Sequence, residues 1–359
     1  MIPKEYFQSQ ELWHTDEIYS EYRIPGMLVT QQGTLLVYCE ARKSHNDWAL
    51  MDILLQRSID GGNSFSEPVL LAKGTDLHPT VNNPVMVQDK NGRIHLLHCE
   101  DYGINGGRIL RRYSDDDGVT WSAPIEITDA TLPEYRNAFA IGPGHGICTH
   151  EGTLICPVWM VPKEYNSPLT SHKPSVISTL YSKDNGETWS CGEVLSTTPM
   201  TISPTETEVA LLADGTVYLN CRFGGGLTYR GHAYSKSGYS NWKSYEADQA
   251  LIDPACFGSV VSFQPKGKTF TLLFANCASK TTRRLVTVKG SHDGGRTWTI
   301  CKTLDVDRGG YVELAATPCG DRIYVLYETA FGSTCQLVTF NYAWLEENNE
   351  VEQVSVENK

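Results

Sequence analysis

The stretch Ser114-Asp115-Asp116-Asp117-Gly118-Val119-Thr120-Trp121 shows the pattern that decides the fold, Ser-x-Asp-x-Gly-x-Ser/Thr-aromatic. The pattern returns at residues 58–65, 182–189 and 291–298, and a decayed copy without the aspartate occupies residues 235–242. The five starting positions are 56, 68, 53 and 56 residues apart. A period of this length can hold one four-stranded blade of a β-propeller, so the repeats predict a closed ring of blades.

The chemistry of the repeated motif is that of a tight turn. The aspartate accepts hydrogen bonds from nearby backbone N–H groups, the glycine adopts a positive φ, and the aromatic ring packs under the turn. A calcium-binding loop of the EF-hand type does not fit, because Gly118 in its sixth position would make Tyr113 the first ligand. We therefore expect structural turns at these positions.

Composition supports an all-β chain. Among the 359 residues are 31 Gly and 17 Pro, which suit many short strands joined by turns, and long amphipathic helices are not evident. Five marked units leave room for one more, which the stretch before Arg23 can form by pairing with strands after Trp298. We predict a six-bladed β-propeller of four-stranded antiparallel sheets, in one domain that covers residues 1–359.

Charge and cysteine usage narrow the classes of partner and compartment. The net charge is −12 and basic residues are scattered, which argues against a nucleic-acid surface and against a polybasic membrane contact. The eleven cysteines include no CxxC pair, and many of them lie in apolar runs typical of buried thiols. No basic segment followed by an apolar stretch opens the sequence, and no run of 18 apolar residues occurs. We therefore predict a reducing, cytoplasmic compartment. No cluster of metal-ligating residues is evident in the sequence, so we expect no metal or cofactor.

The repeats and the motif Tyr22-Arg23-Ile24-Pro25 together resemble the sialidase (neuraminidase) superfamily, in the branch of bacterial and animal exo-sialidases. The resemblance covers almost the whole chain. Further segments follow in the expected order: Glu40-Ala41-Arg42, Asp47, Asn83-Pro84, Gly142–Gly146, Glu206-Thr207-Glu208, Arg222, Arg283, Gly309–Leu314 and Glu328. The resemblance implies a retaining exo-α-sialidase that removes terminal sialic acid from oligosaccharides or glycoconjugates through a sialosyl-tyrosine intermediate.

By position in these motifs, three arginines are expected to bind the carboxylate of the sugar: Arg23, Arg222 and Arg283. A fixed, always charged, fork-shaped donor suits that task better than lysine does. Glu328 matches the carboxylate that orients the first arginine.

The same resemblance assigns the catalytic groups. Tyr311 matches the nucleophile, Glu206 its base, and Asp47 the general acid that later activates water. A neutral phenol suits this substrate because the carboxylate on the anomeric carbon repels an anionic nucleophile. With an ordinary pKa near 10, the phenol needs a base within hydrogen-bond reach.

Three further residues are expected at the sugar. Arg42 matches an arginine on the side of the 4-hydroxyl group, and Asn83 lies in a segment at the expected place. Trp48, beside the acid, either lines the pocket or packs in its loop.

Several positions have close competitors. Arg284 would face away from Arg283 by the alternation of strand residues, so Arg283 is favoured. Glu208 is expected to be a surface or strand-end residue, and Asp52 an anchor of the following strand. Neither His145 nor Glu313 is expected to be catalytic.

Other functions stay open at this point. The same residues could serve another nonulosonic acid, such as a deaminated form, or transfer or cyclise the sugar instead of giving it to water. A non-catalytic propeller that binds acidic sugars is a third reading, which loss of Tyr311, Glu206 or Asp47 would have signalled.

Overall fold

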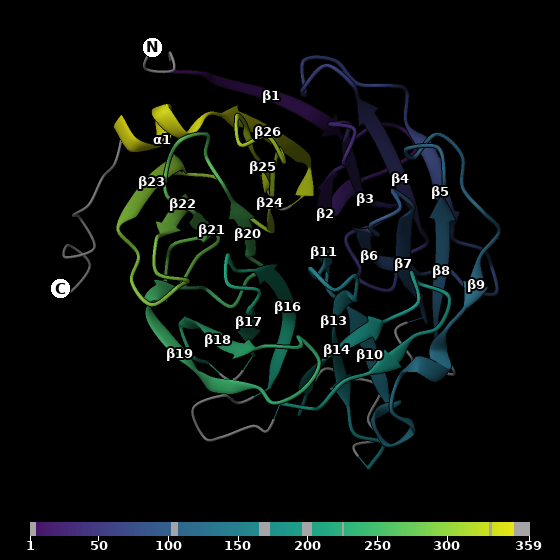
Figure 1. The fold of residues 1–359 in the computed structure, drawn as a ribbon. Coiled ribbons are helices and arrows are strands. Elements are labelled where there is room, and N and C mark those ends of the chain that lie inside the picture. Colours follow the sequence, from purple (N-terminus) through teal and green to yellow (C-terminus); the bar gives the residue numbers. More distant parts are fainter. Residues whose placement is uncertain are drawn as a thin grey trace.

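The computed structural model describes residues 5–101, 107–164, 173–195, 203–224, 226–329 and 332–347. Their strands form six sheets that stand around a central axis like the blades of a propeller (Figure 1). Four sheets hold four antiparallel strands each, and the other two add one two-residue strand to such a set. The predicted six-bladed, all-β fold is confirmed.

Each blade is described from the strand nearest the axis outward. The first blade consists of β2 (Glu21–Val29), β3 (Leu35–Arg42), β4 (Met51–Ser58) and β5 (Val69–Lys73). The second consists of β6 (Val81–Gln88), β7 (Ile94–Glu100), β8 (Arg108–Ser114) and β9 (Ile125–Glu126). The third consists of β10 (Ala138–Ile141), β13 (Leu154–Val161), β14 (Val176–Ser182) and β15 (Ser190–Cys191). The fourth blade consists of β16 (Pro204–Leu211), β17 (Val217–Phe223), β18 (Tyr229–Ser235) and β19 (Lys243–Ile252). The fifth consists of β20 (Ser259–Phe263), β21 (Thr271–Cys277), β22 (Val286–Ser291) and β23 (Ile300–Asp305).

The sixth blade closes the ring from both ends of the chain. It consists of β24 (Val312–Ala316), β25 (Ile323–Thr329), β26 (Thr334–Phe340) and β1 (Phe7–His14). Strand β1 pairs antiparallel with β26, from Phe7 opposite Phe340 to His14 opposite Thr334. Because the first strand completes the last sheet, the ring is joined by backbone hydrogen bonds, as the sequence predicted.

The few remaining elements are short. Strand β11 (Gly144–His145) pairs parallel with β6, and β12 (Ile147–Cys148) pairs with β13. The helices are η2 (Thr128–Ala130), η3 (Pro133–Tyr135) and α1 (Tyr342–Glu347). In the described part of the chain, no helix is long and apolar enough to cross a membrane.

The repeated motif joins the third strand of a blade to the fourth, as in the turn between β8 and β9. There the carboxylate of Asp116 accepts hydrogen bonds from the hydroxyl of Ser114 (2.8 Å) and from the backbone and side chain of Thr120 (2.8 and 2.6 Å). Gly118 has a φ of 82°, which glycine adopts without strain. In the decayed copy the hydroxyl of Ser237 accepts the hydrogen bond from the N–H of Ser240 (3.1 Å) in place of an aspartate. The motif is therefore a turn, as expected.

Candidate active site

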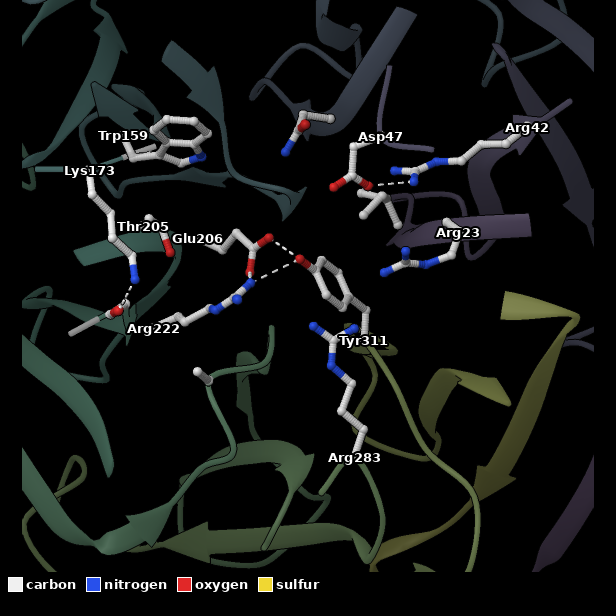
Figure 2. A pocket seen from close by; sticks show the side chains of 14 residues that line it. Arg23, Arg42, Asp47, Trp159, Lys173, Thr205, Glu206, Arg222, Arg283 and Tyr311 are labelled. Carbon is white, nitrogen blue, oxygen red and sulfur yellow. Dashed lines mark hydrogen bonds and ion pairs between the residues drawn. The ribbon is translucent and has the colours of Figure 1, made fainter. Parts of the chain in front are cut away.

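A cavity of about 290 Å³ opens where the six blades meet. Its lining includes eight of the ten residues that the sequence pointed to: Arg23, Arg42, Asp47, Asn83, Glu206, Arg222, Arg283 and Tyr311 (Figure 2). These residues come from five blades and from the loop between β3 and β4. The structure therefore brings residues that are far apart in the chain into one depression.

Backbone irregularities aim several of these side chains. The strand register shifts within β2 between Arg23 and Gly26, within β6 between Asn82 and Val85, and within β16 between Pro204 and Thr207. Bulges of this kind bend a strand and redirect its side chains, and they are common beside functional sites. The sequence motifs that contain Arg23, Asn83 and Glu206 therefore coincide with bulges.

Tyr311 lies at the centre of the cavity, immediately before β24, the innermost strand of the sixth blade (Figure 2). Its hydroxyl donates a hydrogen bond to the carboxylate of Glu206 on β16. Nη1 of Arg222 lies 2.6 Å from Oε2 of Glu206 and 3.1 Å from the hydroxyl oxygen of Tyr311 (Figure 2). The phenol thus has a proton acceptor and a positive charge at the same oxygen atom.

Glu328 on β25 fixes both Arg23 and the backbone of Tyr311. Its Oε1 accepts hydrogen bonds from Nε of Arg23 and from the N–H of Ile24, each at 2.9 Å, and its Oε2 accepts one from the N–H of Tyr311 at 3.0 Å. Glu328 itself is fully buried and is not among the residues that line the cavity. One carboxylate therefore sets the position of an arginine and of the central tyrosine.

Arg283 completes a ring of guanidinium groups around Tyr311. The Cζ atoms of Arg283 and Arg23 lie 5.4 and 5.3 Å from the centre of the phenol ring. Arg23 is paired with Glu328 and Arg222 with Glu206, whereas no carboxylate in the described part of the chain forms an ion pair with Arg283. The ring therefore carries positive charge that a ligand anion can neutralise.

These contacts set the protonation states of the central pair. Burial by itself would raise the pKa of the Glu206 carboxyl, but Arg222, the hydrogen bond from Tyr311, and Arg283 outweigh it and lower that pKa. Burial and the nearby Glu206 raise the pKa of the Tyr311 hydroxyl well above its ordinary value. At neutral pH Glu206 is therefore ionised and Tyr311 is neutral.

Asp47 belongs to the loop between β3 and β4, and its carboxylate lies at the cavity beside Arg42 (Figure 2). Its Oδ1 accepts a hydrogen bond from Nη1 of Arg42 at 2.7 Å, and its side chain is 55% exposed. Arg42 is completely buried and is held by Glu40 at 2.9 and 2.5 Å. Glu40 also accepts a hydrogen bond from the N–H of Asn83 (2.7 Å), so a chain of polar contacts supports the exposed carboxylate.

The structure distinguishes the predicted site residues from the neighbouring residues of the same type. Arg283 lines the cavity and Arg284 does not. Asp52 accepts hydrogen bonds from Tyr19 (2.6 Å) and from the N–H of Gly74 (3.0 Å), so it anchors its strand as expected. The expectation of a surface or strand-end position for Glu208 is wrong, because this side chain is completely buried.

Two outcomes differ from the expected lining. Trp48 is 38% exposed and is not among the cavity residues, so its contact with substrate stays a prediction. Sequence reasoning missed Trp159, Lys173 and Thr205, which line the wall across from Asp47 (Figure 2). Trp159 lies in the apolar run of β13, where its sequence neighbours do not distinguish a core residue from a cavity residue.

Comparisons with known proteins place the chain among related sequences. Residues 67–345 match the family described as the BNR repeat-like domain. The sialidase of Micromonospora viridifaciens is 30% identical over 357 residues, covering 92% of this chain and 53% of that protein. Sialidase-2 of Rattus norvegicus is 30% identical over 285 residues, covering 71% of this chain and 72% of the relative.

A solved structure shares the fold as well. The Hadza microbial sialidase Hz136 superposes with a TM-score of 0.78 at 26% identity, covering 90% of this chain and 65% of that one. The chain spans about half the length of the Micromonospora protein, so the likeness concerns the propeller. From the family match, the similarity to rat sialidase-2 and the shared propeller, we conclude that the chain belongs to the sialidase superfamily.

Proposed function

We propose that the protein is a retaining exo-α-sialidase that hydrolyses terminal sialic acid from sialylated oligosaccharides or glycoconjugates. The observation that carries the proposal is the hydroxyl of Tyr311, hydrogen-bonded to the Glu206 carboxylate and surrounded by three guanidinium groups in one cavity. The superfamily membership supports it.

The ring of arginines suits a sugar that carries a carboxylate. Arg23, Arg222 and Arg283 present planar, permanently charged donors from three different blades. Five cationic side chains line the cavity although the whole chain has a net charge of −12. The positive charge of the cavity lining thus outweighs the negative net charge of the chain at this site, which suits binding of an anionic substrate.

In the first chemical step, the hydroxyl oxygen of Tyr311 attacks the anomeric carbon and its proton passes to Glu206. The bond from that carbon to the leaving oxygen breaks as Asp47 gives this oxygen a proton. Arg222, 3.1 Å from the phenol oxygen, stabilises the negative charge that develops there. The transfer to Glu206 is needed because the pKa of Tyr311 is raised.

In the second step, water attacks the anomeric carbon while Asp47 accepts its proton. The bond between tyrosine and sugar breaks, and the phenolate recovers the proton from Glu206. Asp47 can reach both the leaving group and the water because more than half of its side chain is exposed. Two inversions give net retention at the anomeric carbon.

The test uses an aryl α-sialoside and a 3-fluoro sialosyl fluoride, whose second fluorine slows hydrolysis of a covalent adduct. We expect release of the aryl group, the α-anomer as the first product in NMR spectra, and an adduct mapped to Tyr311 by mass spectrometry. No turnover, or the β-anomer as first product, would refute the proposal. Mass analysis of the released sugar also separates hydrolysis from transfer or cyclisation.

A further inference from the structure

Three ionisable side chains meet next to the Tyr311–Glu206 pair but outside the cavity lining. Nδ1 of His145 lies 2.7 Å from Oε1 of Glu313 and 3.1 Å from Oε1 of Glu208. All three residues are buried, the two glutamates completely. We call His145, Glu208 and Glu313 the axial cluster. None of the described residues that line the cavity belongs to it.

The axial cluster is connected to the central pair through two strands. Glu208 follows Glu206 by two residues on β16, and Glu313 follows Tyr311 by two residues at the start of β24. The register of β16 shifts between Pro204 and Thr207, and Tyr311 immediately precedes β24, so the link between the two sets of residues runs along the backbone and not through a shared strand face. His145 on β11 connects the two glutamates and thereby ties one strand to the other.

Backbone contacts strengthen this connection. Glu208 accepts hydrogen bonds from the N–H of His145 and from the N–H of Val260 on β20, each at 2.9 Å. The N–H of Thr207, between the two glutamates of β16, donates to the carbonyl of Gly142 at 3.3 Å. Four strands, β11, β16, β20 and β24, are thus joined at one point by the axial cluster.

The space around the axial cluster is closely fitted. A Cβ atom on Gly144, whose φ is 97°, would lie 1.9 Å from Oε1 of Glu208 and 2.8 Å from Oε2 of Glu313. The hydroxyl of Tyr38 on β3 faces the cluster and donates to the carbonyl of Gly144 at 2.7 Å. A side chain at position 144 would therefore displace the carboxyl groups of Glu208 and Glu313 from these positions.

Charge balance indicates how the axial cluster is protonated. Burial alone would lower the pKa of His145, but Glu208 and Glu313 raise it well above its ordinary value. Burial and the charge of Glu208 raise the pKa of Glu313. Oε2 of Glu313 is buried without a hydrogen-bond partner among the described residues, which also favours a neutral carboxyl group. An imidazolium, one carboxylate and one carboxylic acid give a neutral cluster.

We propose that His145, Glu208 and Glu313 are positioning residues, which set the separation between the Tyr311 hydroxyl and the Glu206 carboxylate through the strands that carry this pair. The inference rests on the proposed function, because it assigns the pair a role in turnover. Since the axial cluster does not line the cavity, its loss should lower kcat and leave KM unchanged.

The test compares Glu313→Gln, Glu313→Ala and His145→Gln with the wild type. Glutamine copies the shape and neutrality of a protonated glutamate, so Glu313→Gln should keep kcat within about twofold of wild type. Glu313→Ala and His145→Gln should lower kcat by about 10- to 100-fold at constant KM, because small misplacements of reacting groups cost rates of this order. Rescue by glutamine but not by alanine is the expected signature.

Controls separate positioning from loss of folding and from failure of the proposed function. His95→Gln removes another buried imidazole, on β7 and 3.7 Å from Asp89, which does not line the cavity, and should lower stability without lowering kcat per folded molecule. Unchanged kcat in Glu313→Ala and His145→Gln, or losses that track only the folded fraction, would overturn the inference. Elemental analysis showing one divalent metal per chain would overturn it too, because these atoms could also hold a cation. An inactive wild type would refute the proposed function itself.

Discussion

Replacement of Arg283 by lysine tests the arginine ring at its least constrained member. Arg283 is half-buried and lies 5.4 Å from the ring centre of Tyr311, with no ion-pair partner among the described residues. Lysine keeps the positive charge but loses the planar fork that can hold both oxygens of a carboxylate. The change therefore isolates the geometry of the donor from its charge.

The expected magnitude follows from one lost hydrogen bond. A hydrogen bond to a charged group contributes about 1.5–3 kcal/mol, which corresponds to about 10- to 150-fold in a dissociation constant. Stability should hardly change, because the substitution breaks no ion pair in the described part of the chain. By contrast, Arg23→Lys would also disturb the contact with Glu328, and its effect on binding would be mixed with an effect on folding.

The assay measures calorimetric binding of a non-hydrolysable thio-linked sialoside and of its methyl ester. Arg283→Lys should weaken binding of the acid much more than binding of the ester, whose carboxyl group is uncharged. Arg284→Lys is the matched control, since Arg284 does not line the cavity. Equal losses for both ligands, or a larger loss in the Arg284 variant, would refute the reasoning.

Three further outcomes are expected. Tyr311→Phe should reduce turnover of an aryl sialoside by about 10³-fold or more with an unchanged circular dichroism spectrum, and near-normal turnover would exclude a nucleophilic role. The pKa of Glu206 is lowered in the folded protein, so its carboxylate should stay ionised at every pH above the ordinary glutamate pKa of about 4.3. Both kcat/KM and the contribution of this carboxylate to stability should therefore be lost only as the pH falls below that value. A pH–rate profile whose acid limb lies well above that value would contradict this. Asp116→Ala removes three turn hydrogen bonds and should cost about 1–2 kcal/mol in urea unfolding, while kcat per folded molecule stays the same.

Much of the fold could be predicted because its signal is local and repeated. The hydrogen bonds of each motif turn close within a few residues, as those of Asp116 do, so the required side chains stand together in the sequence. Five copies of the motif, one of them decayed, then indicated the blades, and the leftover segments indicated the pairing of β1 with β26. The parallel strand β11 had no such signal, because it is two residues long and its partner lies far away in the chain.

The sequence by itself determined which side chains are available for chemistry, since the resemblance of its motifs to those of sialidases pointed to Arg23, Glu206 and Tyr311. Only the tertiary structure decided what surrounds them. Glu208, expected near the surface, is completely buried, and Trp159 lines the cavity instead of the core alone. The reason is physical: burial and pKa at the axis depend on strands from several blades that meet there, and no local pattern within one strand records that meeting.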